Sequence, residues 1–235
     1  MLEEQCPACG VIFRKFVAGL SASITEVDVR DQGDRARSHV LDWLTRLLEA
    51  PQEGRGVRAV VGAALWLLAA WCAWRFFRFN IADPESLPLP FLHGAMVPFH
   101  EFGHILFSPF GEFIHVAGGS LMQFLMPLGF GIYFVGWRHD NLAGSLMLWW
   151  EGTQWVELAS YCYDAKTPVM ILLTGRTGDT GGHDYVDMLG DLGLLNHAHE
   201  VAALMKYFGV LLLLVALAWG GLLLVRTWRD HAGGN

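Results

Sequence analysis

Residues 57–78, VRAVVGAALWLLAAWCAWRFFR, determine which class of fold this chain can adopt. As a helix rising about 1.5 Å per residue, this stretch is long enough to cross a hydrocarbon layer of about 30 Å. Its arginines Arg58, Arg75 and Arg78 lie near its two ends, where their charges can reach the membrane surface. We therefore predict a transmembrane helix over these residues.

The rest of the chain is also too apolar for an ordinary soluble domain. Hydrophobic residues make up 53% of its 235 positions, and the chain contains ten Trp. Residues 205–228, MKYFGVLLLLVALAWGGLLLVRTW, form a second long apolar stretch flanked by Lys206, Arg226 and Arg229, so we predict a second span there. The formal charge of −7 argues against nucleic acid as a partner, because binding nucleic acid requires a basic surface.

Three weaker apolar stretches, 88–108, 117–137 and 142–162, lie between these two spans and are interrupted by Gly, Pro or an acid. Membrane helices tolerate such interruptions where neighbouring protein or a watery cavity satisfies the freed polar groups. The fold class is therefore predicted to be all-α, a polytopic transmembrane bundle of about four or five spans with these stretches as its inner walls. Five spans would place the arginine-flanked C-terminus outside, so one stretch could instead be re-entrant.

Residues 1–56 are predicted to form a short cytoplasmic segment ahead of a transmembrane domain over residues 57–235. They contain no apolar core of a cleavable signal peptide, so the first span is expected to act as an uncleaved anchor. The segment from about residue 22 to 50, which includes SHVLDWLTRLLEA at 38–50, predicts an amphipathic helix that packs on the membrane surface or on the bundle. The positive-inside bias places the segment in the cytoplasm because of its basic residues, Arg14, Lys15, Arg30, Arg35, Arg37, Arg46 and Arg55.

Residues 94–110, GAMVPFHEFGHILFSPF, place ionisable side chains inside an apolar stretch. Residues four apart in a helix project from the same side, so His100 and His104 can direct imidazole nitrogens at one metal ion. Zinc bound by two His and a third protein ligand keeps an open position for water. Glu101 lies where it can take the proton of that water as it attacks a peptide carbonyl. The spacing predicts a zinc site with Glu101 as the catalytic base.

A polar cluster that only satisfies its own hydrogen bonds is the alternative interpretation. Among chains with ten His, on the order of one in a hundred would contain the pattern His-Glu-x-x-His by chance. Placing His and Glu side chains at membrane depth costs several kcal/mol unless they are paired, so such residues are usually kept for a function. Both considerations favour the metal site.

The HEFGH sequence in an apolar helix, followed by the apolar GGSLMQFLMPL of residues 118–128, resembles a known family. It is similar to the membrane-embedded zinc metallopeptidases of the site-2 protease clan, particularly the smaller bacterial M50B-like members. The resemblance covers about residues 88–190. It implies a bacterial inner-membrane enzyme that cleaves membrane-protein substrates within or near the bilayer, with an Asp from a later segment as third zinc ligand.

This chain departs from the family at the third ligand. The Asn-Pro-Asp-Gly and Leu-Asp-Gly elements that usually supply the Asp do not occur in it, so Glu157, Asp164, His183 and Asp184 compete for the role. In GRTGDTGGHDYVDML, residues 175–189, Asp184 begins a predicted helix after a Gly-Gly pair. Either it is a helix N-cap, or it ligates zinc with His183 beside it. Asp184 is our first choice, because an oxygen ligand matches the clan's pattern.

The stretch WWEGTQWVELASYCYDA, residues 149–165, offers the second choice. Its polar residues Glu151, Gln154, Glu157 and Tyr161 recur at helical spacing on one side of an apolar helix, and such a side normally faces a bundle interior. Glu157 could be the third ligand, or could hold a ligand His through its other ring nitrogen. The alternative is a helix near the membrane interface with solvated acids.

The N-terminal CPACG places Cys6 and Cys9 in the knuckle of a zinc ribbon. A structural zinc site needs four ligands, and this knuckle supplies two. It could be completed across a homodimer, could be a relic, or could be a redox dithiol, although the βαβ pattern of thioredoxin-like proteins is missing.

These observations predict a zinc-dependent membrane metallopeptidase that uses water activated by the metal. The alternative from a different class is a non-catalytic membrane scaffold or regulator that binds metal in the same pocket. A di-iron membrane oxidase is disfavoured because it would need several further His-x-x-His clusters. The expected partners are the lipid bilayer and a membrane-protein substrate.

Overall fold

The structure, a computed structural model, describes residues 38, 41–42, 45–49, 55–172, 175, 177–178 and 182–233. The chain divides into two compact units, Met1–Leu47 and Leu48–Asn235. The CPACG knuckle and most of the predicted amphipathic helix lie outside the described residues. The predicted site falls in the second unit.

The regular elements of the described residues are all helical, as the sequence predicts. One isolated antiparallel bridge joins Ile171 to Thr177. The helices, with the short 3₁₀ turns marked η, are α3 (Arg55–Arg78), η1 (Pro84–Ser86), α4 (Pro90–Phe107), η2 (Ser108–Phe110), α5 (Glu112–Gly136), α6 (Asn141–Asp164), α7 (Asp184–Asp191), η4 (Leu195–His197) and α8 (Ala198–Gly233).

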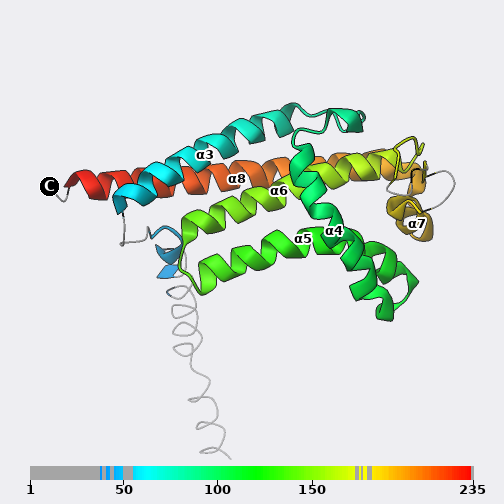
Figure 1. The fold of residues 1–235 in the computed structure, drawn as a ribbon, viewed down its shortest axis with the longest axis horizontal. Helices are drawn as coiled ribbons and strands as arrows, with labels where there is room; N and C mark the ends of the chain where they lie inside the picture. Colours follow the sequence, from blue (N-terminus) through cyan, green and yellow to red (C-terminus); the bar gives the residue numbers. More distant parts are fainter. Residues whose placement is uncertain are drawn as a thin grey trace, which may run out of the picture. The chain divides into compact units, whose positions relative to one another are not determined.

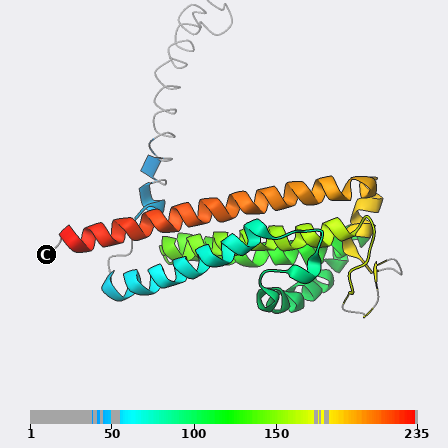
Figure 2. The same ribbon diagram turned by 90° about the horizontal axis from the view of Figure 1, so that it is seen from above.

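Helix α6 is the central helix of the second unit, packed against α8 and against α5 (Figure 1). Helix α3 packs on α8, and the two run in opposite directions side by side in both views (Figures 1 and 2). Helix α4 packs on α5 at a steep angle to it (Figure 1). The first residues of α3 and the last residues of α8 therefore lie at the same end of the bundle.

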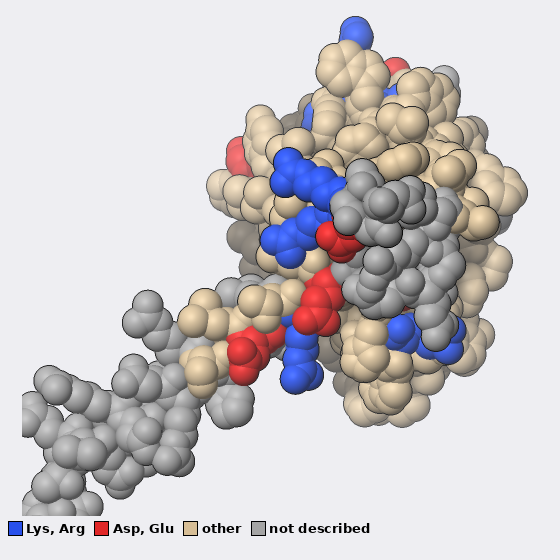
Figure 3. All heavy atoms as spheres, turned by 90° about the vertical axis from the view of Figure 1, so that its left-hand side faces the viewer, with Lys and Arg blue, Asp and Glu red and all other residues tan. Residues whose placement is uncertain are grey.

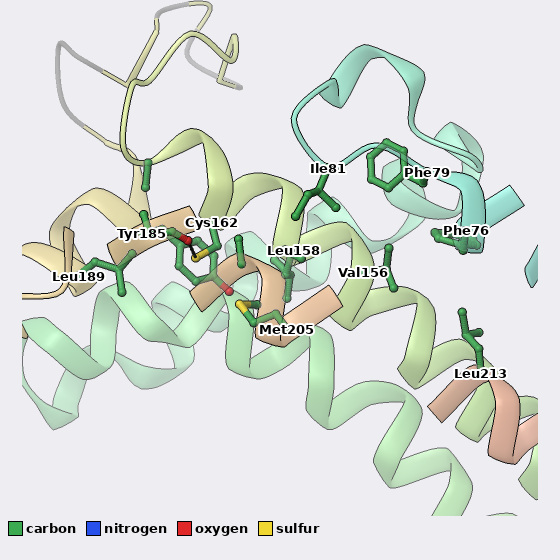
Figure 4. Packing of buried hydrophobic residues seen from close by; sticks show 14 of the residues in the cluster. Phe76, Phe79, Ile81, Val156, Leu158, Cys162, Tyr185, Leu189, Met205 and Leu213 are labelled. Carbon is green, nitrogen blue, oxygen red and sulfur yellow. Dashed lines mark hydrogen bonds between the residues drawn. The ribbon is translucent and has the colours of Figure 1, made fainter. Parts of the chain in front are cut away.

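The core of the bundle is formed where α3, α6, α7 and α8 meet (Figure 4). Val156 and Cys162 of α6 are fully buried there, as are Phe76 of α3 and Leu213 of α8. Helices α6 and α8 approach closely because Gly152 and Gly209 face each other, and a Cβ built on Gly209 would lie 2.7 Å from the Gly152 carbonyl oxygen. Small residues of this kind are typical of packed membrane helices.

Three of the described helices contain segments long and apolar enough to cross a membrane, namely Ala59–Arg78, Glu112–Gly136 and Leu195–Asp230. Large apolar side chains are exposed along them, including Leu67 at 63%, Ile132 at 55% and Leu214 at 51% of their surface. Exposed apolar surface on this scale is expected where lipid surrounds a helix bundle. The chain therefore has the character of an integral membrane protein.

Helices α4 and α6 coincide with two of the predicted inner stretches but are not among the three membrane-length segments. In α4 the hydropathy is lowered by His93 and by the His-Glu-x-x-His residues, and in α6 by polar residues that the bundle buries, such as Thr153, Gln154 and Glu157. Burial against neighbouring helices lets α6 keep these side chains away from lipid.

The end of the bundle at which α8 ends is charged. Figure 3 faces this end and shows Lys and Arg side chains beside Asp and Glu side chains. The Arg226 guanidinium of α8 donates a hydrogen bond of 3.1 Å to the Leu48 carbonyl oxygen. At the opposite end, α6 ends, α7 follows and α8 begins (Figure 1).

Candidate metal centre

Three donor atoms meet between α4 and the start of α7. His100 and His104 lie one turn apart on α4, and their ring centroids are 4.8 Å apart. Oδ2 of Asp184 lies 2.9 Å from Nε2 of His100 and 3.5 Å from Nε2 of His104. Around a tetrahedral zinc, nitrogen and oxygen ligands are separated by about 3.3 Å. Both distances from Asp184 are therefore close to the spacing of two ligands around one zinc ion.

The second nitrogen of each imidazole has its own acceptor. Nδ1 of His100 donates to Oε1 of Gln123 at 2.8 Å, and Nδ1 of His104 donates to the carbonyl oxygen of His115 at 2.9 Å. The His115 ring donates in return to the carbonyl oxygen of His104 at 2.8 Å. Hydrogen bonds of this kind fix ring orientation and hold a proton on Nδ1, so that a metal would bind at Nε2 in place of the proton that His100 donates to Asp184.

Gly119 of α5 forms the floor beneath the two Nε2 atoms. A Cβ built on Gly119 would lie 2.5 Å from Nε2 of His100 and 2.6 Å from Nε2 of His104. Any side chain here would occupy the space into which both imidazoles point. The missing side chain leaves that space to a ligand, so the residues present fit a metal ion.

Asp184 is held in place by the chain on both sides of it. Its backbone N–H donates to the Tyr161 hydroxyl at 3.1 Å, and Gly182, two residues before it, has a φ of +83°, which favours glycine. Burial raises the pKa of Asp184, but the neighbouring imidazoles of His100 and His104 outweigh burial and hold that pKa below its usual value. A carboxylate that stays ionised is the form that binds a cation.

The N-cap interpretation of Asp184 does not match the geometry. The N-cap residue of α7 is His183, and its side chain makes no capping hydrogen bond. Asp184 is the first residue of the helix, and its carboxylate faces the two imidazoles.

Glu101 lies beside the two imidazoles on α4. One ligand atom each of His100, Glu101 and His104 fall within 4.8 Å of one another. Glu101 is exposed, whereas His100, His104 and Asp184 keep 14%, 17% and 12% of their side-chain surface accessible. The three side chains are therefore partly accessible, and the exposed Glu101 lies next to them.

The other candidates for the third ligand have different partners. Asp164 accepts hydrogen bonds from the backbone of Val169 and Met170, and its Oδ2 lies 3.3 Å from Nε2 of the fully buried His183. Burial lowers the pKa of His183. The His183 ring stacks on Tyr161 with centroids 4.2 Å apart. Asp164 and His183 therefore support the segment that carries Asp184.

Glu157 faces His93, two turns before His100 on α4. Its Oε2 lies 3.7 Å from Nδ1 of His93, and among the described residues neither carboxylate oxygen has a hydrogen-bond partner. Two other residues on the polar side of α6 contact the residues of the metal centre. Tyr161 binds the Asp184 backbone, and Gln154 accepts a 3.3 Å hydrogen bond from Gln123, the partner of His100.

No protein-family model, no curated protein and no solved structure matches this chain. The resemblance to the site-2 protease clan therefore rests on the HEFGH sequence and its apolar surroundings.

Sequence reasoning missed Gly119, Gln123 and His115 as parts of the centre. A signal for two of them was present, because Gln123 is a polar residue in an otherwise apolar stretch and Gly119 belongs to a Gly-Gly pair in it. His115 gave a weaker signal, because its ring contacts only the backbone of His104 and it holds the His104 ring through its own backbone carbonyl, which every residue has.

Proposed function

We propose that the protein is a membrane-embedded zinc metallopeptidase in which His100, His104 and Asp184 hold the metal and Glu101 is the catalytic base. The observation that carries this proposal is the convergence of two Nε2 atoms and one carboxylate oxygen over a glycine, with a further carboxylate alongside. Three protein ligands are the number typical of catalytic zinc, whereas structural zinc has four.

Zinc held in this way supplies the Lewis acidity that makes water a nucleophile near neutral pH. Glu101 takes the proton of the water as its oxygen attacks the peptide carbonyl carbon, and returns that proton to the nitrogen that leaves. Asp184 balances the charge of the metal, and Gln123 and the His115 carbonyl hold the imidazoles in the required tautomer.

The proposed setting is a bacterial inner membrane, with membrane-protein substrates. We propose that α3, α5, α6 and α8 cross the bilayer, that α4 enters without crossing, and that both termini are cytoplasmic. Four crossings return the chain to its starting side and put Arg226 and Arg229 of α8 on the side favoured by the positive-inside bias. The homodimer through Cys6 and Cys9 is proposed on the CPACG sequence alone.

The test is proteolysis by wild type and by Glu101→Gln, each co-expressed with a panel of single-span membrane proteins. Gln has nearly the size of Glu but cannot accept the proton, so we expect cleavage to fall about 10²- to 10⁴-fold while bound zinc stays constant. Glu112→Gln is the matched control, because Glu112 is an exposed acid at the start of the neighbouring helix α5. Equal cleavage by wild type and Glu101→Gln would contradict the peptidase proposal.

A metal-binding scaffold is the second candidate, and the donor geometry supports it equally. It has no use for Glu101 as a base, so Glu101→Gln would leave its binding partners and metal content unchanged. The same pair of variants therefore separates the two functions.

A further inference from the structure

A second site lies at the far end of α3, on an element that the metal centre does not use. A cavity of about 360 Å³ opens there, and we refer to it as the Arg–Trp groove. Its lining consists of residues from the last two turns of α3 and from the following loop, Trp71, Trp74, Arg75, Arg78, Phe79, Ser86 and Pro88. The volume is within the range of small-molecule binding sites.

The two arginines of the groove are positioned by the two tryptophans. The Arg75 guanidinium lies 5.7 Å from the ring centre of Trp71, and that of Arg78 lies 5.5 Å from the ring centre of Trp74. A cation–π contact at this distance restrains each guanidinium beside its tryptophan, and the N–H groups of the exposed guanidinium can still bind a ligand.

Neither guanidinium forms an ion pair with a carboxylate of the described residues, and both side chains are exposed. A third cation lies at the same level, since Lys206 Nζ of α8 donates to the Phe79 carbonyl oxygen at 2.7 Å. The groove thus presents positive charge that the described part of the chain does not neutralise. An anionic ligand complements it.

The position of the groove along α3 indicates which class of anion binds there. It lies in the last turns of the membrane-length segment Ala59–Arg78, at the depth where a span meets lipid headgroups. Trp71 and Trp74 are 56% and 57% exposed there, as expected of an aromatic belt. On the same helix face, one turn before Trp71, Leu67 is 63% exposed and offers apolar surface to an acyl chain.

We propose that the Arg–Trp groove binds an anionic phospholipid, with the headgroup phosphate between the guanidiniums of Arg75 and Arg78 and an acyl chain along Leu67. The planar fork of a guanidinium matches phosphate oxygens. Two arginines that form no ion pair among the described residues disfavour a choline or ethanolamine headgroup, because each of these headgroups carries its own positive charge. The groove therefore selects phosphatidylglycerol over phosphatidylcholine.

The experiment measures the phospholipid that stays bound to the full chain in detergent, by native mass spectrometry with equal phosphatidylglycerol and phosphatidylcholine. We expect wild type to prefer phosphatidylglycerol by about 10- to 30-fold, and Arg75→Gln/Arg78→Gln to lose that preference. Arg138→Gln/Arg229→Gln is the matched control, because it removes the same charge from exposed positions outside the groove. This control should keep the wild-type preference.

Replacement of the two tryptophans tests the contribution of the two cation–π contacts apart from the charge of the arginines. Trp71→Leu/Trp74→Leu keeps an apolar surface and both arginines, so we expect the preference to fall by about 2- to 5-fold. A wild type without preference would overturn the proposal, as would equal loss in both double-arginine variants. The second result would mean that net charge attracts the lipid, and that the arginines of α3 only complement the negative end of its helix dipole.

Discussion

The metal centre depends on a residue without a side chain. Gly119 faces both Nε2 atoms so closely that a methyl group would fill the space between them. We predict that Gly119→Ala lowers zinc affinity by about 10- to 100-fold, an effect of the size seen when residues that orient metal ligands are removed. The measurement is a zinc competition titration with a chromophoric chelator.

The control for this change lies on the same helix. A Cβ on Gly129 of α5 would meet no atom within 4 Å, so Gly129→Ala should bind zinc as wild type does. Helix propensity rises equally in both variants, which removes that effect from the comparison. Unchanged zinc affinity in Gly119→Ala would show that the metal does not sit over this glycine.

The crossing of α4 and α5 is the element-scale feature that builds the centre. Gly103, inside the HEFGH sequence, and Gly118 of α5 are in backbone contact, and a Cβ on Gly103 would clash with the Gly118 carbonyl. We predict that Gly103→Ala forces the helices apart, destabilises the protein by about 1–3 kcal/mol and weakens zinc binding as well. Thermal unfolding in detergent, with and without zinc, gives both quantities.

Gly94 provides the matched control for the crossing, because a Cβ there would meet nothing within 4 Å although it lies on the same helix. Gly94→Ala should leave the unfolding midpoint near that of wild type. A Gly103→Ala protein as stable as Gly94→Ala would mean that the two helices do not need this contact.

The elements themselves were largely predictable, but their pairing was not. The stretches 88–108, 117–137 and 142–162 correspond to α4, α5 and α6 because apolar length is a local property of sequence. Which helix packs on which depends on backbone approach at glycines and on distant polar pairs such as Gln123 with Gln154. A single sequence does not encode such pairs in any periodicity.

The candidate site, too, was predictable only where it depends on local sequence. The i, i+4 spacing predicted that His100 and His104 would face one point, and their rings do lie together. The choice of Asp184 over Asp164 and Glu157 rested on a family pattern. In the structure Asp184 lies beside the two imidazoles, whereas Asp164 lies beside His183 and Glu157 beside His93. That Asp184 binds zinc stays a prediction.

The opposite directions of α3 and α8 predict on which side of the membrane the two ends of the bundle's chain lie. Because α3 begins and α8 ends at the same end of the bundle, the segment before α3 and the residues after α8 should face the same compartment. With four crossings and a cytoplasmic N-terminus, a fluorescent protein fused after residue 235 should fluoresce, and alkaline phosphatase fused there should be inactive. The reverse pattern would contradict this topology.

The zinc content of the purified protein, measured by plasma mass spectrometry, tests the central claim most directly. The measurement uses a Cys6→Ser/Cys9→Ser background, so that the CPACG knuckle contributes no metal. We predict about one zinc per chain, its loss in His100→Ala and at least a 10-fold weaker affinity in Asp184→Ala, because two of three ligands do not hold the ion firmly. Asp164→Ala should weaken zinc binding by less than 10-fold, because Asp164 supports the segment that carries Asp184 but offers no ligand to the metal. Full zinc in His100→Ala would contradict the metal centre, and loss of zinc in Glu157→Ala but not in Asp184→Ala would move the third ligand to α6.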